Sequence, residues 1–308
     1  DETDRSVFPS LLQQLDDPKM VRRFLANVMP RDGGVRLDKS FPAFCRRHGW
    51  PSFEAELTAV ISAASATTIS RNAALLQILC LNRDKSAERI GLCRRLADRA
   101  VASLVTLDDQ PAENDWRTAR VNRPALLGSL VKSMLAVAAD QPLARLIEHV
   151  LSRDDKYDLT DSHLAAIFAL ESWLVGKLAE PHRAISRWIA ECRSALESRV
   201  AQVPQKPTDY RRPVKLSCRC SDCRELASFL AKADESVHRF PVRKDRRRHL
   251  HQIIERHKCD LTHVTERRGS PYTLVCTKTT ASYDAARQIH ERDKKNLTRL
   301  KTLEEKIG

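Results

Sequence analysis

Three cysteines lie within six residues of one another, in the sequence Cys218-Arg-Cys220-Ser-Asp-Cys223. This spacing places the thiols too close together for three independent structural roles. Thiolates at Cys-X-Cys-X-X-Cys spacing, with an imidazole nearby, form the ligand set that a structural zinc ion takes. The sequence therefore predicts a tetrahedral zinc site and requires the surrounding chain to supply a fourth ligand.

The fourth ligand must come from outside this triplet. The segment Arg246-Arg-Arg-His-Leu-His251 follows within the next thirty residues, and we favour His249 within it. The spacing leaves open five further candidates, which are His251, His238, His257, His263 and Cys259.

Other roles for the thiols are also open. They can be ordinary reduced thiols, a disulfide, or a Cys-X-X-Cys redox pair. An open catalytic zinc would need a bound water and a general base, for which Glu225 and Glu255 are the obvious candidates. A closed structural zinc site that stabilises a basic scaffold is the favoured interpretation.

Positive charge is concentrated in the last third of the chain, which carries a net charge of +13 over 308 residues. Residues 211–308 contain 24 Lys or Arg against 13 Asp or Glu, whereas residues 1–210 contain 29 against 27. This asymmetry predicts a near-neutral body followed by a basic domain that associates with nucleic acid or an acidic protein surface. The residues predicted to contact phosphates are Arg243, Lys244, Arg246, Arg247, Arg248, Arg267 and Arg268.

Residues 1–203 carry the pattern of amphipathic helices. Apolar residues recur at intervals of three and four, first in residues 7–15 and then repeatedly along the segment. Helix starts are predicted at Asp17-Pro18, Ser70, Ser86 and Arg123-Pro124. The pattern predicts a mainly α-helical body resembling a HEAT or armadillo solenoid, although no clean sequence repeat is present. No catalytic constellation is recognisable in it.

The sequence changes character after residue 203. Three prolines between Pro204 and Pro213 prevent a helix, so residues 204–214 are predicted to form a linker. Residues 215–308 are predicted to form a basic α+β zinc-binding domain with a C-terminal helix, small enough to benefit from a metal. Its expected elements are a helix at 225–230, a strand at 237–242, a helix at 244–257, a hairpin of 260–266 and 272–279, and a helix at 281–307.

The sequence also predicts a cytoplasmic protein without a membrane segment. No apolar run reaches the roughly 18 residues that a membrane span needs, because the best candidates, such as Leu126 to Ala139, are interrupted by residues such as Lys132. The acidic start Asp1-Glu-Thr-Asp-Arg5 does not resemble a signal peptide, and a start without Met indicates an excised fragment. Most of the other cysteines stand singly along helical patterns, as buried free thiols do.

The tail sequence resembles a region of a known protein family. The resemblance lies in Cys218-X-Cys220-X-X-Cys223-Arg-Glu-Leu-X-X-Phe229-Leu230, in Arg248-His249-Leu250 and in residues 265–279. Similar motifs occur in the carboxy-terminal region of large fungal and bacterial proteins with a prolyl-hydroxylase-like, iron(II)- and 2-oxoglutarate-dependent oxygenase domain nearer their amino terminus. The resemblance covers residues 215–283 and implies that this chain is the non-catalytic region that follows such a domain.

The oxygenase chemistry itself is not expected in this chain. Iron in these enzymes is held by a facial triad that includes a His-X-Asp/Glu element. None of the ten histidines is followed two positions later by Asp or Glu. The sequence therefore predicts a non-catalytic scaffold and binding region with a structural zinc. The alternatives are a zinc-dependent hydrolase with an open Cys/His site and a scaffold for protein partners alone.

Overall fold

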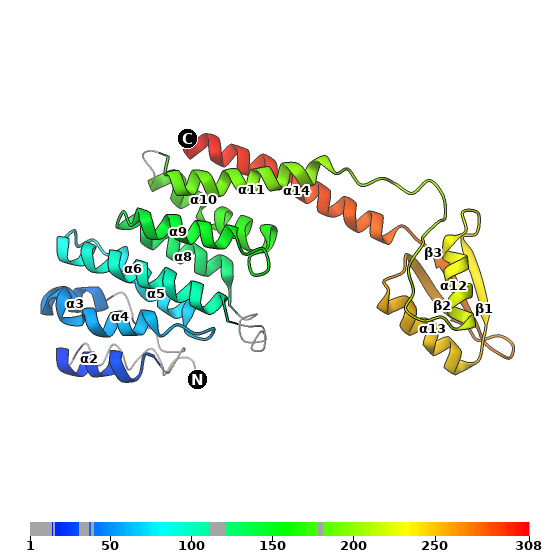
Figure 1. The fold of residues 1–308 in the computed structure, drawn as a ribbon, viewed down its shortest axis with the longest axis horizontal. Helices are drawn as coiled ribbons and strands as arrows, with labels where there is room; N and C mark the ends of the chain where they lie inside the picture. The colour runs from blue at the N-terminus through cyan, green and yellow to red at the C-terminus, as the bar shows by residue number, and fades with distance from the viewer. Residues whose placement is uncertain are drawn as a thin grey trace. The chain divides into compact units, whose positions relative to one another are not determined.

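The computed structural model describes residues 16–30, 40–110, 121–177 and 181–307, together with Gln14 and Leu37 (Figure 1). The first predicted helix, in residues 7–15, lies outside this description apart from Gln14. The chain divides into two compact units. Unit 1 comprises Asp1–Ala195 with Arg299–Gly308, and unit 2 comprises Leu196–Thr298. The division predicted from composition, with a linker at 204–214, stays a prediction.

The described part of unit 1 is built from helices. They are α2 (Pro18–Asn27), α3 (Phe41–His48), the 3-10 helix η1 (Trp50–Phe53), α4 (Glu54–Ser62), α5 (Ile69–Cys80), α6 (Ala87–Asp108), α8 (Arg123–Ala136), α9 (Asp140–Leu151), the π-helix η3 (Leu159–Leu164) and α10 (Ala165–Lys177). Two further helices, α11 (Arg183–Ala201) and α14 (Ala281–Ile307), contribute residues to both units.

The helices of unit 1 contact both the next helix and helices further along the chain. α4 contacts α6, α5 contacts α6 and α8, and α8 contacts α10. Figure 1 shows them as successive layers from α2 onward. The mainly helical body is thereby confirmed, while a regular repeat solenoid stays a prediction.

Local sequence explains where several of these helices begin. The Asp17 carboxylate accepts a hydrogen bond from the backbone N–H of Lys19 at 2.8 Å, and Pro18 fits the first turn of α2. Ser86 caps α6 in the same way through the N–H of Arg89. The predicted cap at Ser70 is wrong, because α5 begins at Ile69 and Ser70 lies within its first turn.

Unit 1 also buries a charged group. The Asp108 side chain, only 1% exposed, accepts hydrogen bonds from Tyr157 Oη at 2.6 Å and His149 Nε2 at 2.9 Å, and it pairs with Arg123 at 3.0 Å. Burial raises the pKa of Asp108, but those two hydrogen bonds and the charge of Arg123 outweigh it and leave the pKa below its usual value. The ionised carboxylate therefore ties α6 to α8, α9 and the segment before η3.

Unit 2 contains a three-stranded antiparallel sheet and two helices of its own. In chain order its elements are α12 (Ser221–Ala231), β1 (Val237–Pro241), α13 (Lys244–Arg256), β2 (Leu261–Glu266) and β3 (Thr273–Lys278), with strand order β1-β3-β2. Strand side chains alternate between two faces, so Leu274 and Cys276 are buried while Val264 is 65% exposed. The helices therefore cover one face of the sheet, and the predicted small sheet is confirmed.

The core of unit 2 joins both helices to that face. Its buried members are Cys223, Leu226, Phe229, Leu230, Phe240, Val242, Leu250, Ile253, Ile254, Cys259, Leu261, Leu274 and Cys276. An extended segment before α12, residues 210–217, closes one side of this core, and we call it the strap. The N–H of Tyr210 donates to Ala233 O and that of Arg212 to Leu230 O, while the Arg212 guanidinium donates to Thr279 O at 2.7 Å.

Within the described residues, no helix combines the length and the apolar composition needed to cross a membrane.

Candidate metal centre and basic surface

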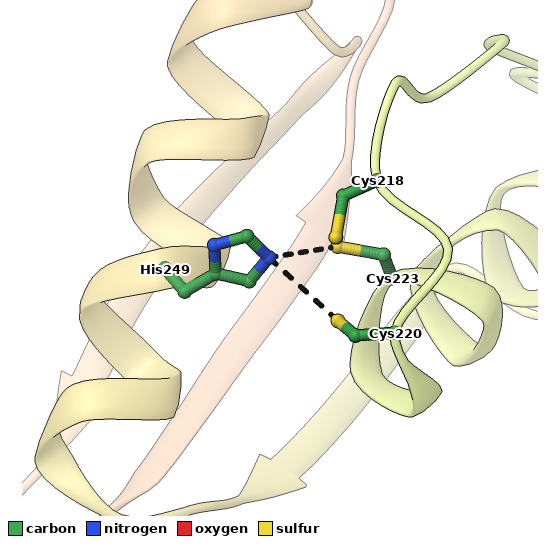
Figure 2. A group of neighbouring side chains, drawn as sticks. All are labelled: Cys218, Cys220, Cys223 and His249. Atoms are coloured by element: carbon green, nitrogen blue, oxygen red, sulfur yellow. Dashed lines mark hydrogen bonds between the residues drawn. The ribbon is translucent and has the colours of Figure 1, made fainter.

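The three cysteines of the triplet and His249 come together in unit 2 (Figure 2). Cys218 and Cys220 lie in the loop before α12, Cys223 lies in the first turn of α12, and His249 projects toward them from α13. We call these four residues the Cys/His cluster. Cys223 is 1% exposed, Cys218 and His249 are half-buried, and Cys220 is exposed.

The geometry of the Cys/His cluster can accommodate a metal ion. His249 Nε2 lies 3.6 Å from Cys220 Sγ and 3.2 Å from Cys223 Sγ, and all four potential ligand atoms lie within 4.8 Å of one another. Zinc with ordinary bond lengths and tetrahedral angles separates S and N ligands by about 3.6 Å and two S ligands by about 3.8 Å. The residues therefore can hold a metal ion with only small adjustments.

The thiols also influence one another's ionisation. The backbone N–H of Cys223, helped by the side chains of Cys223, Cys218 and His249, lowers the pKa of Cys220 to about 7. Burial raises the pKa of Cys223, and the adjacent thiols raise it further. Three thiols so close cannot all ionise unaided, whereas a dication removes the repulsion between their thiolates.

Two contacts beside the Cys/His cluster hold its segments together. Arg246 forms a two-pronged ion pair with the buried carboxylate of Asp222, with Nε donating to Oδ2 at 2.7 Å. On the other side, the N–H of Ser217 donates to His257 Nε2 at 3.3 Å. The first contact joins α12 to α13, and the second joins the chain before α12 to the C-terminal end of α13, so contacts within the protein position the four residues of the Cys/His cluster.

The other candidates for the fourth ligand are engaged elsewhere. His238 contacts Glu225 and Glu235 through its two ring nitrogens, and His251 and His263 face each other with ring centroids 4.5 Å apart. The remaining two are His257, which accepts from Ser217, and Cys259, which lies in the core. Among the described residues, His249 is the one of the six candidates that lies in the Cys/His cluster.

The open-zinc alternative lacks a poised general base. Glu225 contacts His238 at 2.9 Å. Glu255 follows His249 by six residues on α13, which places it about 9 Å further along the axis and on another side of the helix. Neither carboxylate is part of the Cys/His cluster.

The seven predicted phosphate-binding residues divide into two groups. Successive helical residues point about 100° apart, so Arg246, Arg247 and Arg248 face three directions. Arg246 pairs with Asp222, and Arg247 donates to Val242 O at 3.1 Å and Tyr272 O at 3.3 Å. The other five are exposed and form no ion pair with any residue that the structure describes; they are Arg243, Lys244, Arg248, Arg267 and Arg268.

These five residues, which we call the basic end, meet at one end of the sheet. Pro241 and Glu266, the last residues of β1 and β2, both pair with Thr273, the first residue of β3. Arg243 and Lys244 directly follow β1 at the start of α13, Arg248 lies one turn on, and Arg267 and Arg268 directly follow β2. The structure thus brings together charges that are far apart in sequence.

Two neighbours of these sites escaped the sequence prediction. Asp222 reads as a spacer in the cysteine motif, and Tyr272 as an ordinary strand residue. An aromatic residue close to Arg267-Arg268 is a signal that could have identified Tyr272, because basic and aromatic residues interleave in nucleic-acid sites. Nothing in the sequence pairs Asp222 with Arg246.

Fold and site together define a mainly helical protein with a Cys/His cluster that can hold a metal ion. Comparison with protein-family models, curated proteins and solved structures finds no match to this chain.

Proposed function

We propose that this chain is a non-catalytic scaffold and binding region whose unit 2 is a zinc-stabilised module that binds the phosphate backbone of nucleic acid. Zinc bound by Cys218, Cys220, Cys223 and His249 joins the loop before α12 to α13. Three thiolates and an imidazole are ligands that select zinc over magnesium or calcium. Unit 1 serves as the helical scaffold, in the manner of a HEAT or armadillo stack.

The basic end carries this proposal. Residues 239–248 and 264–273 together contain eight Lys or Arg and two carboxylates. One of these carboxylates, Glu266, is already paired with Arg239. The five cations of the basic end break no ion pair when they meet phosphate groups, and binding releases the counterions condensed on the nucleic acid.

The experiment is a titration of labelled oligonucleotides by fluorescence anisotropy over a range of salt concentrations. Five phosphate contacts predict a log-log slope of about −4.5 on duplex DNA. Arg267→Glu with Arg268→Glu removes two contacts, so the slope is expected to fall to about −2.7 and affinity to weaken alike for all sequences.

A matched control reverses two charges at the other end of α13, in Arg256→Glu with Lys258→Glu. Both residues are exposed, and the twelve helical steps from Lys244 to Arg256 place Arg256 about 18 Å away along the axis. Equal losses in both double variants, or no measurable binding at low salt, would contradict the proposal. Reversing Arg246 is avoided, because that change also leaves Asp222 unpaired beside the Cys/His cluster.

On the resemblance of residues 215–283, we also propose that this binding region serves a 2-oxoglutarate oxygenase domain outside the chain. The test is the sequence of the complete gene product. A His-X-Asp/Glu element with a distant second histidine upstream of Asp1 supports this link, and a complete product without one contradicts it.

A further inference from the structure

The basic end includes an exposed aromatic ring that packing alone does not account for. Tyr272 lies between the Arg267-Arg268 turn and the first residue of β3, and 43% of its surface is exposed. Its phenol has no hydrogen-bond partner among the described residues. A tyrosine that served the core would be expected to bury its ring and satisfy its hydroxyl.

The ring is held in place from one side. Arg247 Cζ lies 5.5 Å from the centre of the Tyr272 ring, and the same guanidinium donates to Tyr272 O at 3.3 Å. Thr273, the next residue, is paired with both Pro241 and Glu266 in the sheet. The sheet pairing therefore anchors the main chain beside Tyr272, and Arg247 packs against its ring, which reduces the entropy lost on binding.

An exposed ring among unpaired cations is a combination that binds single strands. Bases stack on aromatic side chains while neighbouring Lys and Arg contact the phosphates. In a duplex the bases already stack on one another and are not free to stack on a tyrosine at the protein surface. The ring therefore distinguishes single strands from duplexes, whereas the cations alone do not.

We infer that Tyr272 is a stacking platform for an unpaired base and that the ligand of the basic end is single-stranded nucleic acid. This inference rests on the proposed function, since the stacked base is held beside the phosphates that the basic end contacts. Acidic residues do not dominate the surroundings: Asp245 in the first turn of α13 and the paired Glu266 are the carboxylates in these segments.

The test measures the affinity of the full chain for an oligonucleotide of about 16 nucleotides, within the range of single-strand site sizes, and for its duplex. Tyr272→Leu removes the ring but keeps an apolar side chain, and Tyr272→Phe keeps the ring. The leucine variant is expected to lose about 5- to 150-fold in single-strand affinity, with duplex affinity unchanged. The phenylalanine variant is expected to bind like the wild type.

Tyr210→Leu provides the matched control. Tyr210 belongs to unit 2 and is 47% exposed, but it lies in the strap before α12. The Tyr210→Leu variant is expected to keep the wild-type affinity for both the single strand and the duplex. Equal zinc content in all variants shows that the fold is intact.

Three outcomes would overturn the inference, each in a distinguishable way. Wild-type single-strand affinity in Tyr272→Leu refutes stacking, while the effect of reversing Arg267 and Arg268 still tests the proposed function. No binding of either oligonucleotide by the wild type refutes both. Binding of polyglutamate as tight as that of an oligonucleotide of equal charge would assign the surface to an acidic protein partner.

Discussion

Replacement of Cys220 by alanine separates the role of the Cys/His cluster from ordinary packing. Cys220 is exposed and occupies the position before α12, where its side chain forms no capping hydrogen bond. Cys220→Ala therefore removes little buried surface and no cap. Any large loss of stability must come from the lost metal ligand.

The expected loss is a large fraction of the stability of an ordinary domain. A complete structural zinc site contributes roughly 10–16 kcal/mol in small zinc domains at pH 7. One ligand in four corresponds to about 2.5–4 kcal/mol of this, against a total of about 5–15 kcal/mol for an ordinary domain. We expect Cys220→Ala to lose zinc and to unfold unit 2 at moderate temperature.

Cys276→Ala is the matched control. Cys276 is fully buried in the same core but lies outside the Cys/His cluster, and burial raises the pKa of its thiol to about 12, so it packs as a neutral group. Its loss is expected to cost about 1 kcal/mol, as small core truncations do, and to leave zinc bound. Replacing the exposed Cys220 is thus expected to reduce stability more than replacing the buried Cys276. This is the opposite of the order that burial predicts.

The assay combines zinc stoichiometry with two optical signals. The sequence contains four tryptophans, all of which precede residue 196, and the described ones, Trp50, Trp173 and Trp188, belong to unit 1. Tryptophan emission is therefore expected to stay unchanged in Cys220→Ala while circular dichroism shows lost structure. A Cys220→Ala protein that keeps one zinc and melts like the wild type would refute the reasoning, as would loss of zinc from Cys276→Ala.

Two further predictions concern unit 1 and catalysis. Asp108→Asn is expected to destabilise unit 1 by roughly 3 kcal/mol at pH 7, because it leaves Arg123 without its buried partner. The pKa of Asp108 is lowered in the folded chain. The difference in stability between the two proteins is therefore present above about pH 4, the usual carboxyl pKa in an unfolded chain. It shrinks as pH falls through the lower pKa of the folded chain. Urea unfolding followed by tryptophan emission measures it, and a difference that persists at pH 2 contradicts the assignment. With iron(II), ascorbate and 2-oxoglutarate, the chain is expected to produce no succinate above a metal-free blank, since no His-X-Asp/Glu element is present in it.

The sequence by itself determined those features that depend on short stretches of chain. Periodicity indicated the helices, and alternation around Gly269-Ser270-Pro271 indicated the β2–β3 hairpin. The Cys218-X-Cys220-X-X-Cys223 spacing identified three members of the Cys/His cluster. Each of these signals arises from neighbours in sequence, because helical turns, strand alternation and close ligand spacing are local geometry.

Only the tertiary structure decided which partners meet across long stretches of chain. His249 rather than His251 joins the cysteines because Leu250, Ile253 and Ile254 turn α13 toward the shared core with α12, and that packing sets which side of α13 faces the cluster. The same packing pairs Arg246 with Asp222.

The sheet register likewise brings Arg243 and Lys244 to the Arg267-Arg268 turn and to Tyr272. These contacts depend on how apolar surfaces from distant segments fit together. No spacing in the sequence records that fit.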